Sequence, residues 1–96
     1  MRTTHDMSLH GLDAAQVHAL VLKAVHRAGR RSERPTRWVA GVSAAAKVAL
    51  AKDQQGAFVA LRDPAAKAGG WFLCGYPLEI DRNHGDQLLT LEAVRP

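Results

Sequence analysis

Gly69-Gly70-Trp71-Phe72-Leu73-Cys74-Gly75-Tyr76-Pro77-Leu78-Glu79-Ile80-Asp81 is the segment on which the predicted core depends, because it holds three of the five aromatic residues in this 96-residue chain. Residues 71–74 form a short apolar run that predicts a buried strand, and the alternation over residues 78–81 predicts a second, half-exposed strand. Between them, residues 75–77 predict a bend, since glycine tolerates positive φ and proline lacks an amide donor. We expect the hydrophobic core to form around these two strands.

A long amphipathic helix is predicted upstream, between Asp13 and Gly29. Asp13 is a favourable N-cap, and Gln16 three residues later completes a capping box. Gly29 is expected to end the helix. Residues 1–12 are mostly polar and are expected to form a flexible N-terminal segment, so that residues 13–96 make up a single domain. The apolar stripe of the helix comprises Val17, Leu20, Val21, Ala24, Val25 and Ala28.

The remaining segments alternate between strand and helix patterns. Together they predict an α+β fold, with one long and one short helix packed on a small, mostly antiparallel sheet of four to five strands. The expected elements are a strand at 37–42, a short helix from Ala44 to about Lys52 capped by Ser43, a turn at Asp63-Pro64, a loop or short helical turn at 65–70, a reversal at 82–86 and a strand at 87–93. Residues 57–61 fit either an extension of the short helix or a strand, and we favour the strand.

Composition limits the class of protein. The chain is 47% hydrophobic and 23% charged, which is typical of a folded, water-soluble protein. Its single cysteine excludes an internal disulfide framework and fits a reducing cytoplasm. No run of residues approaches the length of about eighteen apolar residues that spans a bilayer, and residues 1–10 lack the apolar part of a secretory signal. We therefore expect no membrane association.

The positive charge is concentrated in one segment, residues 23–37. Six basic residues and one acid, Glu33, give this segment a net charge of +5, whereas the rest of the chain sums to −1. Such a local patch favours binding to a phosphate backbone or to an acidic protein surface, although exposed helix-end and linker residues would give the same pattern. The candidate partner- or phosphate-binding residues are Lys23, Arg27, Arg30, Arg31, Arg34 and Arg37.

No pattern in the sequence predicts an enzyme, a metal site or a cofactor. His10, His18 and His26 recur every eight residues, a rise of about 12 Å on a helix, which is too far for shared metal coordination. Cys74 lies in an apolar run where burial would raise its pKa, so a nucleophile–base pair with His84 is not expected. No glycine-rich loop follows a strand and opens a helix, as a phosphate-binding loop requires.

Three pieces of the chain occur in an order found in a known family. They are Arg34-Pro35-Thr36-Arg37-Trp38-Val39-Ala40 after the long helix, Ala51-Lys52-Asp53-Gln54-Gln55-Gly56-Ala57-Phe58 after the short helix, and Phe72-Leu73-Cys74-Gly75-Tyr76-Pro77-Leu78-Glu79-Ile80-Asp81. This order resembles the central and C-terminal part of tailed-phage major capsid proteins. There, a spine helix leads to a strand, a short helix, a "kD.dG.y" turn and an "llGyPv.id" segment. The resemblance covers residues 13–92.

The chain also departs from that family. Its members are much longer and carry an extended arm and a β-hairpin before the spine helix, whereas twelve residues precede Asp13 here. The resemblance therefore implies a reduced, non-enzymatic phage- or prophage-type protein-binding module, a capsid-like structural or assembly accessory protein of the host cytoplasm or the virion. Its expected partners are further copies of itself in a homo-oligomer, capsid subunits, or a host protein.

Two other functions stay open at this point. One is a small phage-encoded inhibitor that binds a host enzyme or defence complex through the basic patch. The other is nonspecific nucleic-acid binding, for which the patch offers about five phosphate contacts. Specific base readout is not expected, because no second helix follows at helix-turn-helix spacing and there is no zinc-finger spacing.

Overall fold

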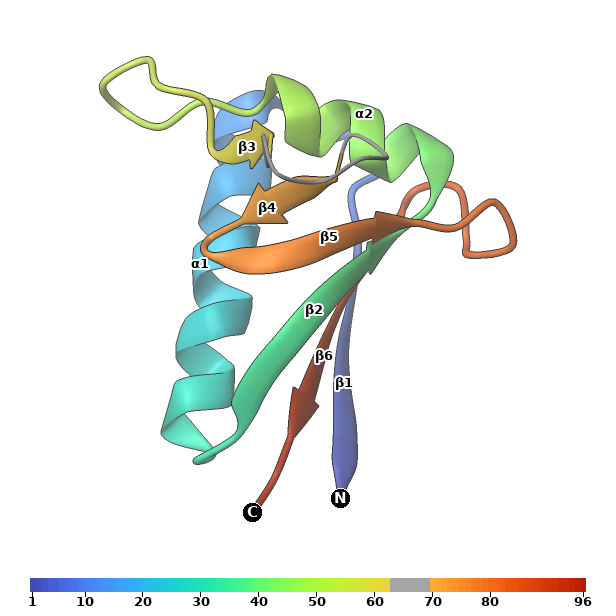
Figure 1. Cartoon of the computed structure of the whole chain (residues 1–96). Coiled ribbons are helices and arrows are strands. Elements are labelled where there is room, and N and C mark those ends of the chain that lie inside the picture. Colours follow the sequence, from blue (N-terminus) through green and yellow to red (C-terminus); the bar gives the residue numbers. More distant parts are fainter. Residues whose placement is uncertain (63–69) are drawn as a thin grey trace.

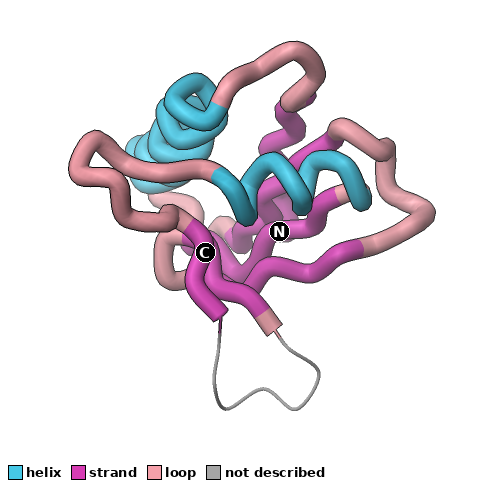
Figure 2. Tube along the Cα trace, turned by 90° about the horizontal axis from the view of Figure 1, so that it is seen from above, coloured by secondary structure: helices cyan, strands magenta, loops and turns pink. Residues whose placement is uncertain are grey.

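A six-stranded sheet carries both helices on one face in the computed structural model, which describes residues 1–62 and 70–96 (Figures 1 and 2). The predicted α+β class is confirmed, and so is the pairing of one long helix with one short one. The predicted four to five strands were too few. The elements are β1 (Arg2–Ser8), α1 (Ala14–Arg30), β2 (Arg34–Ala40), α2 (Val42–Leu50), β3 (Ala60–Arg62), β4 (Trp71–Leu73), β5 (Tyr76–Ile80) and β6 (Leu88–Val94).

The sheet is mixed, with the strand order β1-β6-β2-β5-β4-β3. The β2–β5 pair is parallel, and the other neighbouring strands are antiparallel. The last strand, β6, lies between β1 and β2, so β1 and β2 run in the same direction and α1 connects them. The predicted reversal at 82–86 is a turn, but it does not form a hairpin, because β2 separates β5 from β6.

Residues 71–80 form a tight β4–β5 hairpin. Its two loop residues, Cys74 and Gly75, have φ values of 52° and 83°, the signs that a type I′ turn requires. The chain therefore reverses one residue earlier than predicted, and Tyr76 and Pro77 already belong to β5. Only Leu73 of β4 is fully buried, whereas the sequence predicted burial of the whole run.

Helix α1 begins as the sequence predicts. The Asp13 side chain accepts a hydrogen bond from the backbone amide of Gln16, at 2.8 Å, and the Gln16 side chain accepts one from the backbone amide of Asp13, at 2.9 Å. The prediction that Gly29 ends the helix is wrong, because α1 continues to Arg30 and is capped at Arg31. The predicted apolar stripe faces the core: its fully buried members are Val17, Val21, Ala24 and Ala28.

Helix α2 starts and ends earlier than predicted. Val42, expected at the end of a strand, is its first residue, and Gly41 rather than Ser43 is the N-cap. The Ser43 hydroxyl instead donates a hydrogen bond to the carboxylate of Asp86, in the loop before β6. The helix ends at Leu50, and Lys52 then pairs with Phe58 in an isolated bridge.

The core lies between the helices and one face of the sheet. Trp38 of β2 is completely buried, and its indole Nε1 donates a hydrogen bond to the carbonyl of Leu73, at 2.9 Å. In β6, Leu89 and Leu91 point to the same side, as predicted. Small residues of α2, such as Ala44 and Ala45, let this helix approach the sheet closely.

The N-terminal segment, predicted as flexible over residues 1–12, contains a strand. Arg2–Ser8 forms β1, which pairs with β6 along its whole length. Its inward residues include His5, which is buried against Glu33, and Leu9 follows it into the core. The turn predicted at Asp63-Pro64 and most of the loop predicted at 65–70 fall outside the described residues.

Candidate functional site

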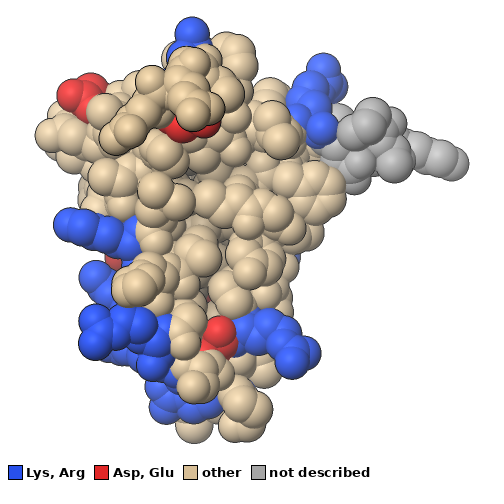
Figure 3. Space-filling view, turned by 90° about the vertical axis from the view of Figure 1, so that its left-hand side faces the viewer, with Lys and Arg blue, Asp and Glu red and all other residues tan. Residues whose placement is uncertain are grey.

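Four of the six basic residues singled out in the sequence lie together on the exposed side of α1. Figure 3 shows Lys and Arg side chains gathered over the lower part of the side of the molecule that α1 occupies. We call Lys23, Arg27, Arg30 and Arg31 the basic face; all four residues are exposed.

Helix geometry places these residues together. At about 100° per residue, Arg27, Arg30 and Arg31 lie within about 80° of Lys23 around the helix axis. The buried stripe that includes Val21 and Ala28 faces the opposite direction. The helical periodicity that turns the apolar stripe toward the sheet therefore turns the basic face toward solvent.

No acidic side chain in residues 1–62 or 70–96 forms an ion pair with the basic face. Like charges three or four residues apart destabilise a helix by a few tenths of a kcal/mol per pair. Arg27 and Arg30 lie in the last turn, where the helix dipole offsets part of this cost. The positive charge of this face is thus available to a partner.

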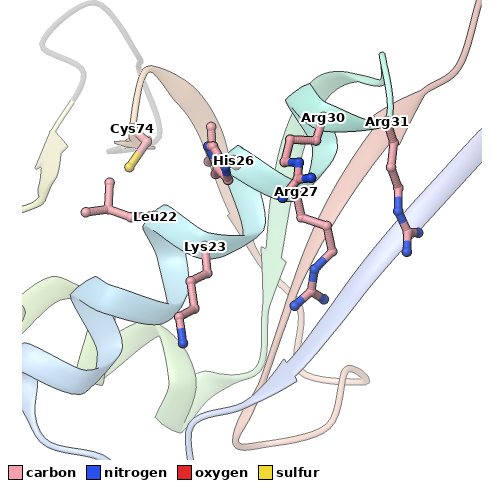
Figure 4. Close-up of a pocket in the computed structure, with 8 residues that line it drawn as sticks. Leu22, Lys23, His26, Arg27, Arg30, Arg31 and Cys74 are labelled. Carbon is pink, nitrogen blue, oxygen red and sulfur yellow. The ribbon is translucent and has the colours of Figure 1, made fainter.

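The basic face borders an open groove with an apolar wall (Figure 4). Leu22, whose side chain is 50% exposed, and the half-buried Val25 and Cys74 supply this wall. Figure 4 shows Leu22 and Cys74 at one end of the groove, with His26 between them and the arginines. The groove therefore offers apolar contact and positive charge side by side.

The other two predicted site residues lie elsewhere. Arg34 lines a neighbouring groove with Tyr76 and Val94, around the start of β2. Arg37 lies on the sheet face away from the helices, where its Nε donates to Oε1 of Glu92 at 2.8 Å and its Nη1 pairs with Glu79. The hydrogen bond between Arg37 and Glu92 is the main cause that lowers the pKa of Glu92 and raises the pKa of Arg37. The charge of Arg37 is therefore already compensated.

A further cleft, which the sequence did not predict, lies between α1 and the edge strand β1. Lys23 and Arg27 line it from the helix, and His5, Asp6 and Met7 line it from the strand. One feature of the sequence indicates this strand weakly: every second residue from 3 to 9 points inward, namely Thr3, His5, Met7 and Leu9. Two of these residues, Thr3 and His5, are polar, so the segment lacks the apolar alternation that predicts a strand.

The chemistry of the single thiol is limited by burial. Cys74 is half-buried in the hairpin loop rather than in a strand as predicted, and desolvation raises its pKa. A raised pKa leaves the thiol protonated at neutral pH, which makes it a poor nucleophile. His84 lies on the other face of the sheet, within 2.8 Å of the Thr90 hydroxyl, and does not act on Cys74.

A chain of hydrogen bonds links His84, Thr90 and Asp6 on the sheet face away from the helices. The Thr90 hydroxyl donates to Oδ1 of Asp6 at 2.6 Å and lies 2.8 Å from Nε2 of His84. Thr90 is only 4% exposed, and Asp6 bonds to the hydroxyl rather than to the imidazole. These hydrogen bonds join the loop after β5 to strands β6 and β1. Because Asp6 does not bond to the imidazole of His84, they do not orient a catalytic base.

Comparison with known proteins yields no significant match to a family model, to a curated protein or to a solved structure. Among the described residues, no three His, Cys, Asp or Glu side chains are grouped so that they could hold a metal ion. The helices in the described ranges are too short or too polar to span a bilayer.

Proposed function

We propose that this chain is a non-enzymatic binding module whose basic face captures an acidic segment of a partner protein. The observation that carries the proposal is the groove in which Leu22, half exposed, lies beside four cations without acidic partners in the described ranges. Protein interfaces combine exposed apolar side chains with arginine in this way. A phosphate backbone would use the cations but would gain little from Leu22.

The proposal keeps the protein-binding role expected from the sequence. A capsid-like role in assembly and the inhibition of a host protein are two settings in which such a module would work. Both stay predictions. Co-purification with particles would support the assembly role, whereas a stable complex with one host protein would support the inhibitor.

Binding to two probes of equal charge tests the proposed function. One probe is a labelled peptide of glutamate and leucine, and the other is a short DNA duplex, each titrated at several salt concentrations. We expect the peptide to bind, and Lys23→Glu with Arg27→Glu to weaken binding about tenfold or more through charge repulsion. Arg82→Glu, which reverses an exposed cation in the loop before β6, is the matched control and should have little effect.

Leu22→Ser separates the protein partner from nucleic acid. The substitution removes apolar surface and leaves every cation in place, so it should weaken the peptide complex only. Tighter binding to DNA, with a steep salt dependence and no effect of Leu22→Ser, would replace the proposed function with nonspecific nucleic-acid binding.

A further inference from the structure

We infer that the acidic partner binds as an extended strand added to the free edge of β1, with acidic residues at every second position facing α1. The inference rests on the proposed function and names how the partner is held. In strand addition, main-chain hydrogen bonds contribute affinity and alternate side chains contribute specificity. Both elements of that arrangement are present along the cleft between β1 and α1.

The main chain of β1 presents hydrogen-bonding groups on its outer side that no residue of 1–62 or 70–96 pairs with. The amide of Leu9 donates to the carbonyl of Gln87, and the amide of Arg95 donates to that of Met1, each at 2.8 Å. In the antiparallel β1–β6 register, these two bonds mark the odd-numbered residues of β1 as the ones that pair with β6. The even-numbered residues Arg2, Thr4 and Asp6 therefore direct their amides and carbonyls outward.

Few of the usual protections cover this edge. β1 is seven residues long, pairs without a register shift and contains neither proline nor lysine; its charged residues are Arg2 and Asp6, and the Asp6 carboxylate accepts a hydrogen bond from Thr90 on the face away from the helices. Natural edge strands are commonly shortened, bulged or blocked to prevent pairing with another chain. A regular, open edge of this length is therefore suited to receive a partner strand.

A row of cations on α1 matches the spacing of an added strand. Lys23 and Arg27 line the cleft one helical turn apart, about 6 Å along the axis, and Arg31 follows four residues later at the C-cap of α1. Side chains on one face of a strand repeat every two residues, or about 6.7 Å. Figure 4 shows the three side chains extending in the same direction from the helix. Glutamate or aspartate at alternate positions of the added strand would meet each cation in turn.

Charge selects an acidic segment over a second copy of this chain. Pairing two β1 strands edge to edge would bring Lys23 and Arg27 of one copy toward the same residues of the other, since both line the cleft beside that edge. Like charges in such proximity repel, whereas an acidic strand neutralises them. The chain also carries a net charge of +4, which disfavours self-association.

Two peptides of equal length and composition test the inference. In one, glutamate and threonine alternate over ten residues; in the other, five glutamates precede five threonines. We expect the alternating peptide to bind about tenfold more tightly and to slow hydrogen exchange of the Arg2, Thr4 and Asp6 amides in NMR spectra. Thr4→Pro deletes one outward amide without breaking the β1–β6 ladder and should abolish the preference, whereas Thr4→Val keeps the amide and should preserve it.

The outcomes separate this inference from the proposed function. Equal binding of both peptides without protection of the three amides would overturn strand addition and leave acidic-partner binding intact. Binding of neither peptide, while the glutamate–leucine peptide still binds, would overturn strand addition alone, and failure of all three peptides to bind would overturn both proposals. A dimer in light scattering that Thr4→Pro converts to a monomer would show that a second copy occupies the edge of β1. This result would overturn the inference that an acidic partner strand binds there.

Discussion

His5 and Glu33 form a buried pair, with Nε2 of His5 2.6 Å from Oε1 of Glu33. Their side chains are 5% and 1% exposed, and Nη2 of Arg95 approaches the second carboxylate oxygen at 3.5 Å. The pair joins the edge strand β1 to the residue that precedes β2. The hydrogen bond to His5 is the largest of the effects that lower the pKa of Glu33 below its ordinary value of 4.5.

Glu33→Gln is expected to lower the free energy of unfolding at neutral pH and to have less effect in acid. A carboxylate whose pKa is depressed in the fold stabilises it above the unfolded-state pKa, and this stabilisation is lost as the pH falls through the folded-state pKa. The difference between wild type and variant should therefore narrow below pH 4.5. Urea unfolding followed by circular dichroism from neutral to acidic pH measures it.

Glu79→Gln is the matched control for this experiment, because Glu79 is exposed and its ion pair with Arg37 lies at the surface. Surface pairs contribute little to stability, so this variant should stay close to wild type at every pH. A constant gap between Glu33→Gln and wild type across the pH range would contradict the assigned role of the carboxylate.

The same pair explains why β1 could not be predicted from the sequence. Strand patterns are recognised by alternating apolar residues, but two inward positions of β1 are Thr3 and His5. Their polar atoms find partners far along the chain, the Ala93 carbonyl for Thr3 and Glu33 for His5. A contact between residues 28 positions apart leaves no local signal in the sequence, so the polar composition of residues 1–12 predicts a flexible segment instead.

Trp38→Phe is expected to destabilise the fold by about 2 kcal/mol, from the lost hydrogen bond and the space left by the smaller ring. Trp38 is completely buried, and its indole bonds to the Leu73 carbonyl across the β2–β5–β4 part of the sheet. Trp71→Phe is the same chemical change at a half-buried hairpin position and should cost less. Urea unfolding by circular dichroism ranks the two; a larger loss for Trp71→Phe would contradict the central position of Trp38.

The Cys74 thiol is expected to react slowly with iodoacetamide at neutral pH, with a rate that rises to half its maximum above pH 9.0. Burial raises the pKa of this thiol above its ordinary value, and the thiolate is the reactive form. The control is a short unstructured cysteine peptide, which should react faster at pH 7. A midpoint below pH 8 would mean that the nearby cations stabilise the thiolate, and would reopen the question of a nucleophile.

The sequence predicted the candidate site in part, and the reason is helix periodicity. Lys23, Arg27 and Arg30 belong to one regular helix and Arg31 is its C-cap residue, so their spacing places them on one face. Arg37 follows a turn and lies in β2, where its direction depends on the sheet. Its partners Glu79 and Glu92 come from β5 and β6, and the position of β2 between those strands is not encoded in any local pattern.

Two glycine-to-alanine substitutions are expected to have opposite effects on stability. A Cβ at Gly41 would lie 2.0 Å from the Gly85 carbonyl oxygen and 2.7 Å from that of Asp86, both backbone atoms, so the junction of β2 and α2 has to shift. We expect Gly41→Ala to cost about 3 kcal/mol. A Cβ at Gly29 would meet nothing within 4 Å, and in a helix alanine is favoured over glycine by about 0.5–1 kcal/mol. Urea unfolding measures both, and a Gly41→Ala variant as stable as Gly29→Ala would refute the close contact between that junction and the loop before β6.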